Sequence, residues 1–410
     1  MVLALGRWFA GMSHRKPVRR TQRGRWAVTR LEDRTVPANV AFAAAAFAGP
    51  NTAMTVNVYG PTGTQVASFV PFSDFVGGNV NIAIGDVNGD GTQDVIVAPG
   101  NGGGPIVNVY DGAALPGVTR PLFQLVAYDP LLRGGTFVAA GDINGDGKAD
   151  VITGAGLGGG PHVKAFSGAD NGATLLLSFF AYEGTFRGGV RVGASDFGGD
   201  NGQNPNGTFR PGGAPGSHNG DAEIVTAPGP GRLVDLELWD YDAQLNDPDH
   251  FGTIISDQTF PGFTGGAFVG GGFFTNNVDS DGFVYADITV SADVTGGPQE
   301  KMFRLDAFTD PARRDVAVYI PANQVVAGDP AVVDPNYPLT STFPFDTGLR
   351  GGLRIGTVKD LNGDGRDELI VGPGPQGGPQ VRVLSGLNGT DLVPTFLAGD
   401  PNDRNGIFVA

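Results

Sequence analysis

The chain has 410 residues, contains no cysteine and carries a formal net charge of −15. The lack of cysteine excludes a disulfide framework, a thiolate nucleophile and a cysteine metal site. The acidity disfavours nucleic acid and anionic lipid as partners and favours cations. Glycine is abundant at 68 residues, but 40% of the residues are hydrophobic, which is enough to fill a core, so the glycines indicate turns rather than disorder.

The N-terminal segment differs from the rest of the chain. Residues 1–35 hold nine Lys/Arg against two Asp/Glu, whereas the remainder holds 18 against 40. The opening stretch MVLALGRWFAGM is short, and no stretch of the chain approaches the roughly 18–20 apolar residues of a membrane span. A basic cluster follows the apolar stretch, which reverses the order of a secretory signal. We therefore predict that residues 1–37 are a disordered basic tail or an export segment, and that residues 38–410 form one folded domain.

One unit of sequence recurs along the chain. A clear copy reads LRGGTFVAAGDINGDGKAD, then VITGAGLGGGP, then HVKAFSGADNGATLLLSFFAYEG. The acidic loops of the copies begin at Asp86, Asp142, Asp196, Asn277 and Asp360. The longer intervals contain loop-like insertions at 201–220 and 309–340. β-Branched and aromatic residues alternate with polar ones, and no segment has sustained helical periodicity, so each unit predicts about four strands.

Stacking of such units predicts an all-β fold, a β-propeller of six blades with about four antiparallel strands each. A four-stranded unit cannot bury both faces alone, and radial repetition around an axis solves this problem. The C-terminal DRNGIFVA matches the start of a unit, and the N-terminal VAFAAAAFAGP matches the strand that follows an acidic loop. We therefore predict that the two termini pair within one blade and close the ring. Seven blades are the alternative, but they need one more unit than the sequence offers.

Three acidic loops have the composition of a metal site. They read GDVNGDGTQD, GDINGDGKAD and KDLNGDGRDE, with oxygen side chains at positions 1, 3, 5 and 9 of DxNxDGxxD. Ca²⁺ takes six to eight oxygen ligands, and glycine permits the positive φ that folds a loop around an ion. We predict one Ca²⁺ site in each loop, with a backbone carbonyl at position 7. The predicted ligands are Asp86, Asn88, Asp90, Thr92 and Asp94; Asp142, Asn144, Asp146, Lys148 and Asp150; and Asp360, Asn362, Asp364, Arg366 and Glu368.

These loops are not EF-hands. An EF-hand has a bidentate Glu at position 12 and flanking helices, whereas position 12 here is Val97, Thr153 or Val371 and the flanks read as strands. An Asp/Asn/Gly turn without metal is the alternative, and repetition in phase with the strands disfavours it.

Two further loops are degraded copies, and the sequence leaves their metal binding open. In the third, Gly198 replaces a ligand, and an insertion separates the acidic residues, which are Asp196, Asp200, Asp221 and Glu223. In the fourth, position 9 is Tyr285, for which Asp287 is a substitute. The predicted ligands of this fourth loop are Asn277, Asp279 and Asp281. The sequence therefore predicts three complete calcium sites and one or two incomplete ones.

The stretch FVGG…IAIGDVNGDGTQDVIVAPG…GGGPIVNVYDG resembles the FG-GAP/VCBS-type repeat, as found in integrin α-subunit propellers. The resemblance covers nearly all of 38–410 and implies a calcium-stabilised propeller, usually extracellular and often found in adhesion or interaction proteins. Integrin heads have seven blades, whereas six are expected here, and the FG and GAP dipeptides appear as FVGG or LRGG and as APG or GAG. RLEDRTVPA at 30–38 resembles a short motif near the N-termini of exported bacterial repeat proteins, which implies a bacterial extracellular or cell-surface protein.

Three functions remain in competition. The first is a non-catalytic adhesion, interaction or scaffold module for an extracellular protein or glycan, with candidate contact loops at 201–220, 240–262 and 309–340. The second is a polysaccharide lyase or glycosidase, although HExxH and GxSxG are absent and GAGLGG is followed by a strand, not a helix. The histidines available to it are His14, His162, His218 and His250. The third is a structural surface-layer or matrix component, and the sequence does not determine the oligomeric state.

Overall fold

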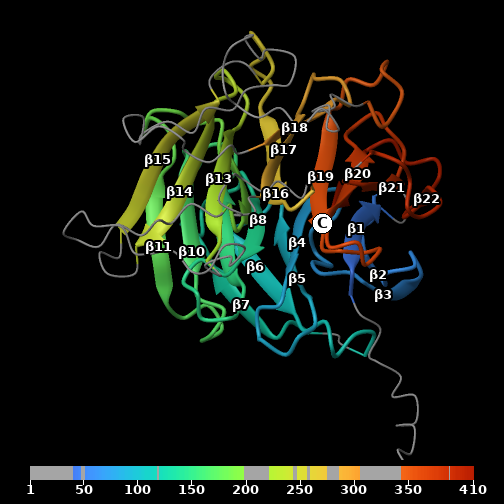
Figure 1. The fold of residues 1–410 in the computed structure, drawn as a ribbon, viewed down its shortest axis with the longest axis horizontal. Coiled ribbons are helices and arrows are strands. Elements are labelled where there is room, and N and C mark those ends of the chain that lie inside the picture. The colour runs from blue at the N-terminus through green and yellow to red at the C-terminus, as the bar shows by residue number, and fades with distance from the viewer. Residues whose placement is uncertain are drawn as a thin grey trace, which may run out of the picture. The chain divides into compact units, whose positions relative to one another are not determined.

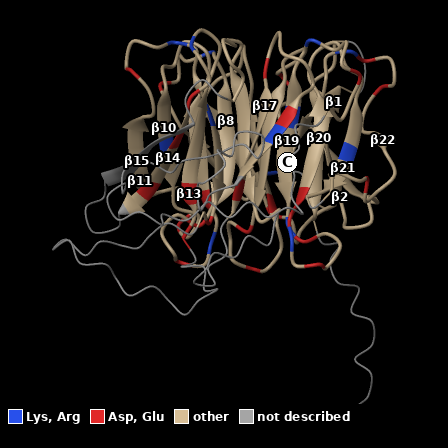
Figure 2. Cartoon of the chain, turned by 45° about the horizontal axis from the view of Figure 1, so that its top comes forward, with Lys and Arg blue, Asp and Glu red and all other residues tan. Residues whose placement is uncertain are grey.

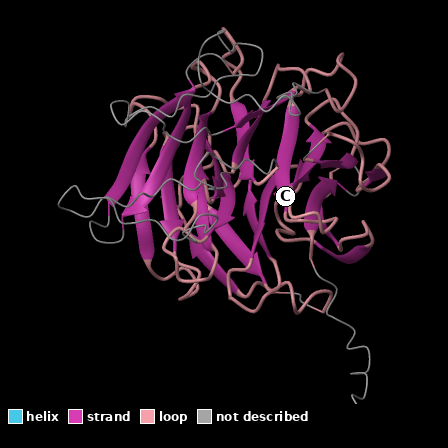
Figure 3. Cartoon of the chain, in the orientation of Figure 1, coloured by secondary structure: helices cyan, strands magenta, loops and turns pink. Residues whose placement is uncertain are grey.

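The structure is a computed structural model that describes residues 40–47, 51–117, 120–197, 221–242, 247–255, 259–274, 286–304, 343–386 and 388–410. The predicted tail at 1–37 and the insertions at 201–220 and 309–340 lie outside these ranges. All regular structure in the described ranges is β-strand, as Figure 3 shows. None of the described residues belongs to a helix that could span a membrane.

The strands form six antiparallel sheets, which we number as blades one to six. Blade one contains β23 (Phe408–Val409), β1 (Phe42–Phe47), β2 (Met54–Tyr59) and β3 (Gln65–Phe69). Blade two contains β4 (Val80–Gly85), β5 (Asp94–Pro99), β6 (Ile106–Tyr110) and β7 (Phe123–Val126). Blade three contains β8 (Thr136–Gly141), β9 (Asp150–Ala155), β10 (His162–Phe166) and β11 (Leu175–Phe180).

The remaining blades follow the same order. Blade four contains β12 (Val190–Ser195), β13 (Glu223–Pro228), β14 (Leu236–Asp242) and β15 (Asp247–Ile255). Blade five contains β16 (Ala267–Gly272), β17 (Asp287–Ala292) and β18 (Glu300–Arg304) within the described ranges. Blade six contains β19 (Leu353–Val358), β20 (Glu368–Pro373), β21 (Gln380–Ser385) and β22 (Phe396–Leu397).

The blades form a closed ring around a central axis. Each innermost strand, from β4 through β8, β12, β16 and β19 to β23, contacts the next, and β23 contacts β4. In Figure 1 these strands lie near the centre, whereas β3, β7, β11, β15 and β22 lie at the rim. The innermost strands approach so closely that a Cβ at Gly193 would lie 2.9 Å from the Cα of Gly270. The predicted six-bladed β-propeller is therefore confirmed.

The two ends of the domain meet in blade one. β23 pairs antiparallel with β1, with Ala44 opposite Val409 and Ala45 opposite Phe408. Ala43 and Ala410 exchange backbone hydrogen bonds of 2.7 and 3.0 Å. The C-terminal strand thus completes a blade begun near the N-terminus, as predicted, and leaves no unpaired edge beside β1.

The second strand of every blade is the most buried element. β1, β5, β9, β13, β17 and β20 are buried at every position. Each blade is covered on both faces by its neighbours, so these strands are near-continuous apolar runs rather than alternating ones. In blades two to six the first residue of this strand is nevertheless acidic, and that residue belongs to the loops described next.

Candidate metal loops

Five loops connect the innermost strand to the second strand in blades two to six. Because the innermost strands run in the same direction around the ring, these loops lie together at one end of the propeller. Figure 2 shows positions of Asp and Glu, coloured red, on the loops at the lower end of the view. Backbone hydrogen bonds join neighbouring loops: the N–H of Ala149 donates to Asp86 O at 2.8 Å, and the N–H of Ala222 donates to Asp142 O at 2.6 Å.

The first loop is folded around its own oxygen side chains. The Asp86 carboxylate accepts bonds from the N–H groups of the fourth, fifth and sixth loop residues at 2.8, 3.0 and 2.8 Å. Asn88 Oδ1 accepts the fifth N–H at 2.8 Å, and Asp90 Oδ1 accepts the seventh at 2.8 Å. Gly89 and Gly91 have φ of 77° and 85°, a conformation that costs glycine little. These bonds all lie within the loop, so the local sequence accounts for its conformation from Asp86 to the seventh residue.

The other two complete loops share this arrangement. The first acidic residue accepts the sixth N–H at 2.7 Å in the loop that begins at Asp142 and at 3.0 Å in the loop that begins at Asp360. The third residue accepts the fifth N–H at 3.0 and 2.8 Å, and the fifth residue accepts the seventh N–H at 3.0 Å in both. The acceptors are Asp142, Asn144 and Asp146 in one loop and Asp360, Asn362 and Asp364 in the other. The last bond orients the seventh residue, which is Thr92, Lys148 or Arg366.

The ninth residue of each loop is buried. Asp94 and Asp150 are 0% exposed and Glu368 is 1% exposed. One Asp94 oxygen accepts the Val87 N–H at 3.0 Å and the other accepts the Gly112 N–H at 2.9 Å, so this carboxylate ties the loop to its blade. Burial raises the pKa of Asp94 to about 6 and the pKa values of Asp150 and Glu368 to about 7. A nearby cation would offset the cost of ionising these groups.

The same buried acid is present in the degraded loops. Glu223 and Asp287 pair with the last residue of the innermost strand, in the register that Asp94 has with Gly85, and both are 0% exposed. Tyr285, which stands at position 9 in the sequence alignment, lies outside the described ranges. The sequence signal for this group is an acidic residue directly before a fully apolar strand.

The remaining residues of the degraded loops are only partly described. Asp196 follows β12 directly, as Asp86 follows β4, whereas Asp200 lies outside the described ranges. The residue that follows β16 is Phe273, so an apolar side chain stands where the complete loops have their first acid. The predicted ligands Asn277, Asp279 and Asp281 lie outside the described ranges. In blade four, Asp221 lies against the second loop, since a Cβ at Gly145 would be 2.1 Å from its Oδ1.

The donor chemistry of the three complete loops fits a hard cation. Within the described ranges, no three Asp, Glu or His side chains form a group that could hold a metal in the conformation observed, because the carboxylates turn toward backbone N–H groups. A carboxylate has about four acceptor sites, and Asp86 uses three of them for the backbone. The side chains at positions 1, 3, 5 and 9 offer oxygen donors, the type that Ca²⁺ prefers.

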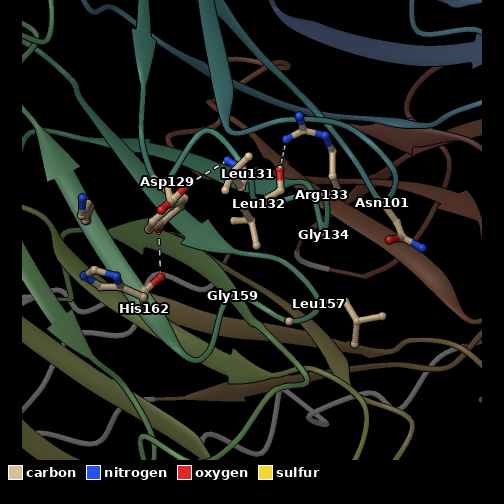
Figure 4. A pocket seen from close by; sticks show the side chains of 12 residues that line it. Asn101, Asp129, Leu131, Leu132, Arg133, Gly134, Leu157, Gly159 and His162 are labelled. Carbon is tan, nitrogen blue, oxygen red and sulfur yellow. Dashed lines mark hydrogen bonds between the residues drawn. The ribbon is translucent and has the colours of Figure 1, made fainter.

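A second candidate site lies at the opposite end, beside blades two and three. Figure 4 shows this cavity of about 580 Å³. Asp129 accepts the Leu131 N–H at 2.8 Å, and Arg133 Nη1 donates to two carbonyls of its own turn at 2.5 and 2.8 Å. Lys164 Nζ donates to a backbone carbonyl at 2.9 Å. The charged side chains that line the cavity thus form hydrogen bonds with the backbone of its walls.

His162 lies in the same cavity and is part of its wall. Its Nε2 is 2.9 Å from Ser178 Oγ, and its ring lies 4.9 Å from that of Phe180 and 5.4 Å from that of Tyr128, measured between centroids. Burial, and to a smaller degree Lys164, lower the pKa of His162. His14 and His218 lie outside the described ranges, as does the side chain of His250.

Comparison with known families identifies the repeat. Residues 86–153 match the model of an FG-GAP-like repeat, and residues 134–177 match the model of an FG-GAP repeat. The first stretch covers parts of blades two and three with the first two complete loops, and the second lies in blade three and includes the loop that begins at Asp142. The chain therefore contains FG-GAP repeats, as its sequence predicted. No curated protein matches the sequence significantly.

Several solved structures match most of the chain at low similarity. Rhamnogalacturonan lyase YesW is 14% identical with a TM-score of 0.36, over 92% of this chain and 69% of that chain. A Bacillus licheniformis rhamnogalacturonan lyase is 13% identical with a TM-score of 0.36, over 92% and 69%. The Dos1 propeller is 12% identical with a TM-score of 0.34, over 87% and 69%. At these identities and scores the similarity carries no inference about activity.

Proposed function

We propose that this six-bladed propeller with FG-GAP repeats is a calcium-stabilised, non-catalytic interaction or scaffold module that works outside a bacterial cell. The observation that supports the proposal is that three loops with the same oxygen side chains and the same internal hydrogen-bond pattern lie at one end of the ring. Ca²⁺ would be held by the side chains at positions 1, 3 and 5 with the carbonyl at position 7, and would offset the buried ninth acid. The partner is a protein or glycan, and nucleic acid is disfavoured by the net charge of −15.

The bound calcium acts on stability rather than on chemistry. Extracellular calcium modules bind with a Kd of roughly 10⁻⁴–10⁻³ M. At tenfold excess over Kd, each site adds about 1.4 kcal/mol to the free energy of unfolding. Three such sites contribute about 4 kcal/mol, which is a large fraction of the stability of an ordinary domain.

Calcium titration by isothermal calorimetry tests the metal part of the proposal. We expect three sites in the wild-type chain, and one fewer in each of Asp90→Asn, Asp146→Asn and Asp364→Asn. Asp170→Asn is the control, because Asp170 is an exposed acid whose carboxylate binds Thr174 in an unrelated turn. A wild-type protein that binds no calcium at millimolar concentration refutes the metal sites.

Capture from the native cell surface tests the interaction part. The predicted contact loop 240–262 contains β15 (Asp247–Ile255), a strand of blade four, so the prediction of a loop there is wrong and this segment cannot be removed without damage to the blade. We expect partner capture that depends on calcium and is lost when one of the insertions 201–220 or 309–340 is replaced by a short glycine linker. Unchanged capture by both variants contradicts contact through these loops. Turnover of a polysaccharide in a glycan panel, abolished by Asp129→Asn and His162→Gln together, supports the alternative of a carbohydrate-active enzyme.

A further inference from the structure

The axis of the propeller is lined by an alternating ring of side chains at the end opposite the acidic loops. One residue near the start of each innermost strand contributes to this ring, which we call the collar. In order around the axis the collar is Phe408, Asn81, Phe137, Arg191, Phe268 and Arg354. Phenylalanine occupies every second position, and the positions between them hold two arginines and one asparagine.

The arginines are stacked between the phenylalanine rings. The guanidinium carbon of Arg191 lies 4.4 Å from the ring centre of Phe137 and 5.5 Å from that of Phe268. The guanidinium carbon of Arg354 lies 4.3 Å from Phe268 and 5.1 Å from Phe408. Such cation–π contacts make a buried guanidinium tolerable and fix its plane, but they supply no counter-charge.

The charge of the collar is not balanced. Asp293, which follows β17, forms ion pairs with both Arg191 and Arg354, the latter at 3.2 Å. The three side chains are 9%, 6% and 2% exposed. Within the described residues, Asp293 is the one acidic side chain that pairs with Arg191 and Arg354. Two buried cations therefore share one anion, which leaves one positive charge in excess. A buried charge without compensation is strongly destabilising.

Hydrogen bonding is incomplete at the same place. The Nε groups of Arg191 and Arg354 are buried and have no hydrogen-bond partner. Burial lowers the pKa of Arg354; Asp293 opposes this shift, and the neighbouring Arg191 reinforces it. Two acceptors at the collar, Asn81 Oδ1 and Asp293 Oδ1, are also buried without a hydrogen-bond partner, so neither is placed to bond the Nε groups. The collar therefore lacks a second negative charge and a bonded partner for the two Nε donors.

A small cavity lies within the collar. Its volume is about 60 Å³. A cavity of this size admits a few water molecules or a small ion. Beside the collar the cavity is lined by a second ring of β-branched side chains, which are Ile82, Val138, Val192, Val269, Ile355 and Val409. This apolar ring offers no alternative partner for the guanidinium groups.

From the shared aspartate, the bare Nε groups and the cavity size, we infer that the collar binds one small monovalent anion of the chloride class between Arg191 and Arg354. The anion neutralises the excess charge and links the innermost strands of blades four and six across blade five. It stabilises the closed ring from the end opposite the acidic loops and requires no calcium.

Bromide locates the site directly, because its anomalous scattering distinguishes it from water. We expect crystals grown in sodium gluconate and soaked in sodium bromide to show an anomalous peak in the cavity, in contact with both arginines. Bromide peaks on the outer surface alone, with water in the cavity, overturn the inference. A peak in the cavity that appears only at molar bromide, with no counterpart in the solution experiment below, indicates an adventitious ion only. This outcome also counts against the inference.

Thermal unfolding measures the same site in solution. At constant ionic strength and saturating calcium gluconate, replacing gluconate by bromide is expected to raise the unfolding midpoint saturably, by about 5 °C at a hundredfold excess over Kd. The charge-preserving Arg354→Lys keeps this effect, whereas Arg354→Gln loses it because the remaining Arg191–Asp293 pair is neutral. Asp293→Asn tightens bromide binding. A bromide effect of equal size in Arg354→Gln and wild type refutes the site, and if that variant does not fold the diffraction experiment decides.

Discussion

Ring closure depends on a short C-terminal segment, and one side chain in it offers a sharp test. Ile407 lies just before β23, is 0% exposed, and donates its N–H to Pro373 O at 3.0 Å. Its Cγ2 covers the backbone of β20, since a Cβ at Gly372 would lie 2.3 Å away. Ile407→Ala leaves a cavity that cannot easily collapse, because the hydrogen-bonded strands around it are fixed.

The expected cost follows from the buried volume. Truncation removes about three methylene equivalents at about 0.8 kcal/mol each, and the residual cavity raises the loss to about 3 kcal/mol. For a domain of this size the unfolding midpoint should fall by roughly 2 °C per kcal/mol, or about 6 °C in all. Differential scanning calorimetry at fixed calcium and chloride measures this shift.

A matched control lies on the outer edge of blade six. Leu397 is 48% exposed at the end of β22, so Leu397→Ala should change the free energy of unfolding by less than about 0.5 kcal/mol. If Ile407→Ala unfolds at the same temperature as Leu397→Ala, the C-terminal strand does not belong to the cooperative ring, and the account of closure is wrong.

Three further predictions concern single positions. Gly135 has a φ of 77°, and a Cβ there would lie 2.3 Å from the backbone of the preceding blade. Gly135→Ala should therefore lower the free energy of unfolding, measured with urea, by about 3 kcal/mol. Gly184→Ala is the control and should lower it little, because a Cβ at Gly184 would have nothing within 4 Å. Asn57 donates a buried 2.6 Å hydrogen bond to a carbonyl of blade six, and Asn57→Ala should cost about 1–3 kcal/mol by the same assay. His162 should titrate by NMR below its usual value; because its folded pKa is lowered, its contribution to stability is complete above about pH 6.5 and is lost as the pH falls below that value. A pKa above 6.5 contradicts the burial argument for His162.

Short-range sequence patterns determine much of this fold. Period-two patterns, Gly-rich turns and the repeated acidic decapeptide determine strands, turns and loops over a few residues each. Six blades and the pairing of the two terminal segments within one blade could therefore be predicted from the sequence, whereas the register, with Ala44 opposite Val409, comes from the structure. The bonds that Asp86 makes within its loop are equally local, since they join residues three to five positions apart. For that reason the position and residue composition of the candidate metal loops could be predicted from the sequence.

Other features were decided only by the tertiary structure. Glu223 and Asp287 are recognised as equivalents of Asp94 through strand register, because insertions of different length hide the match in the sequence. The collar is harder still to predict from the sequence, because arginine in a strand usually faces solvent. Arg191 and Arg354 become a buried pair with an excess positive charge only because six strands converge on one axis. The sequence determines which face of a strand is polar, but the packing of distant blades decides whether that face meets water or another charge.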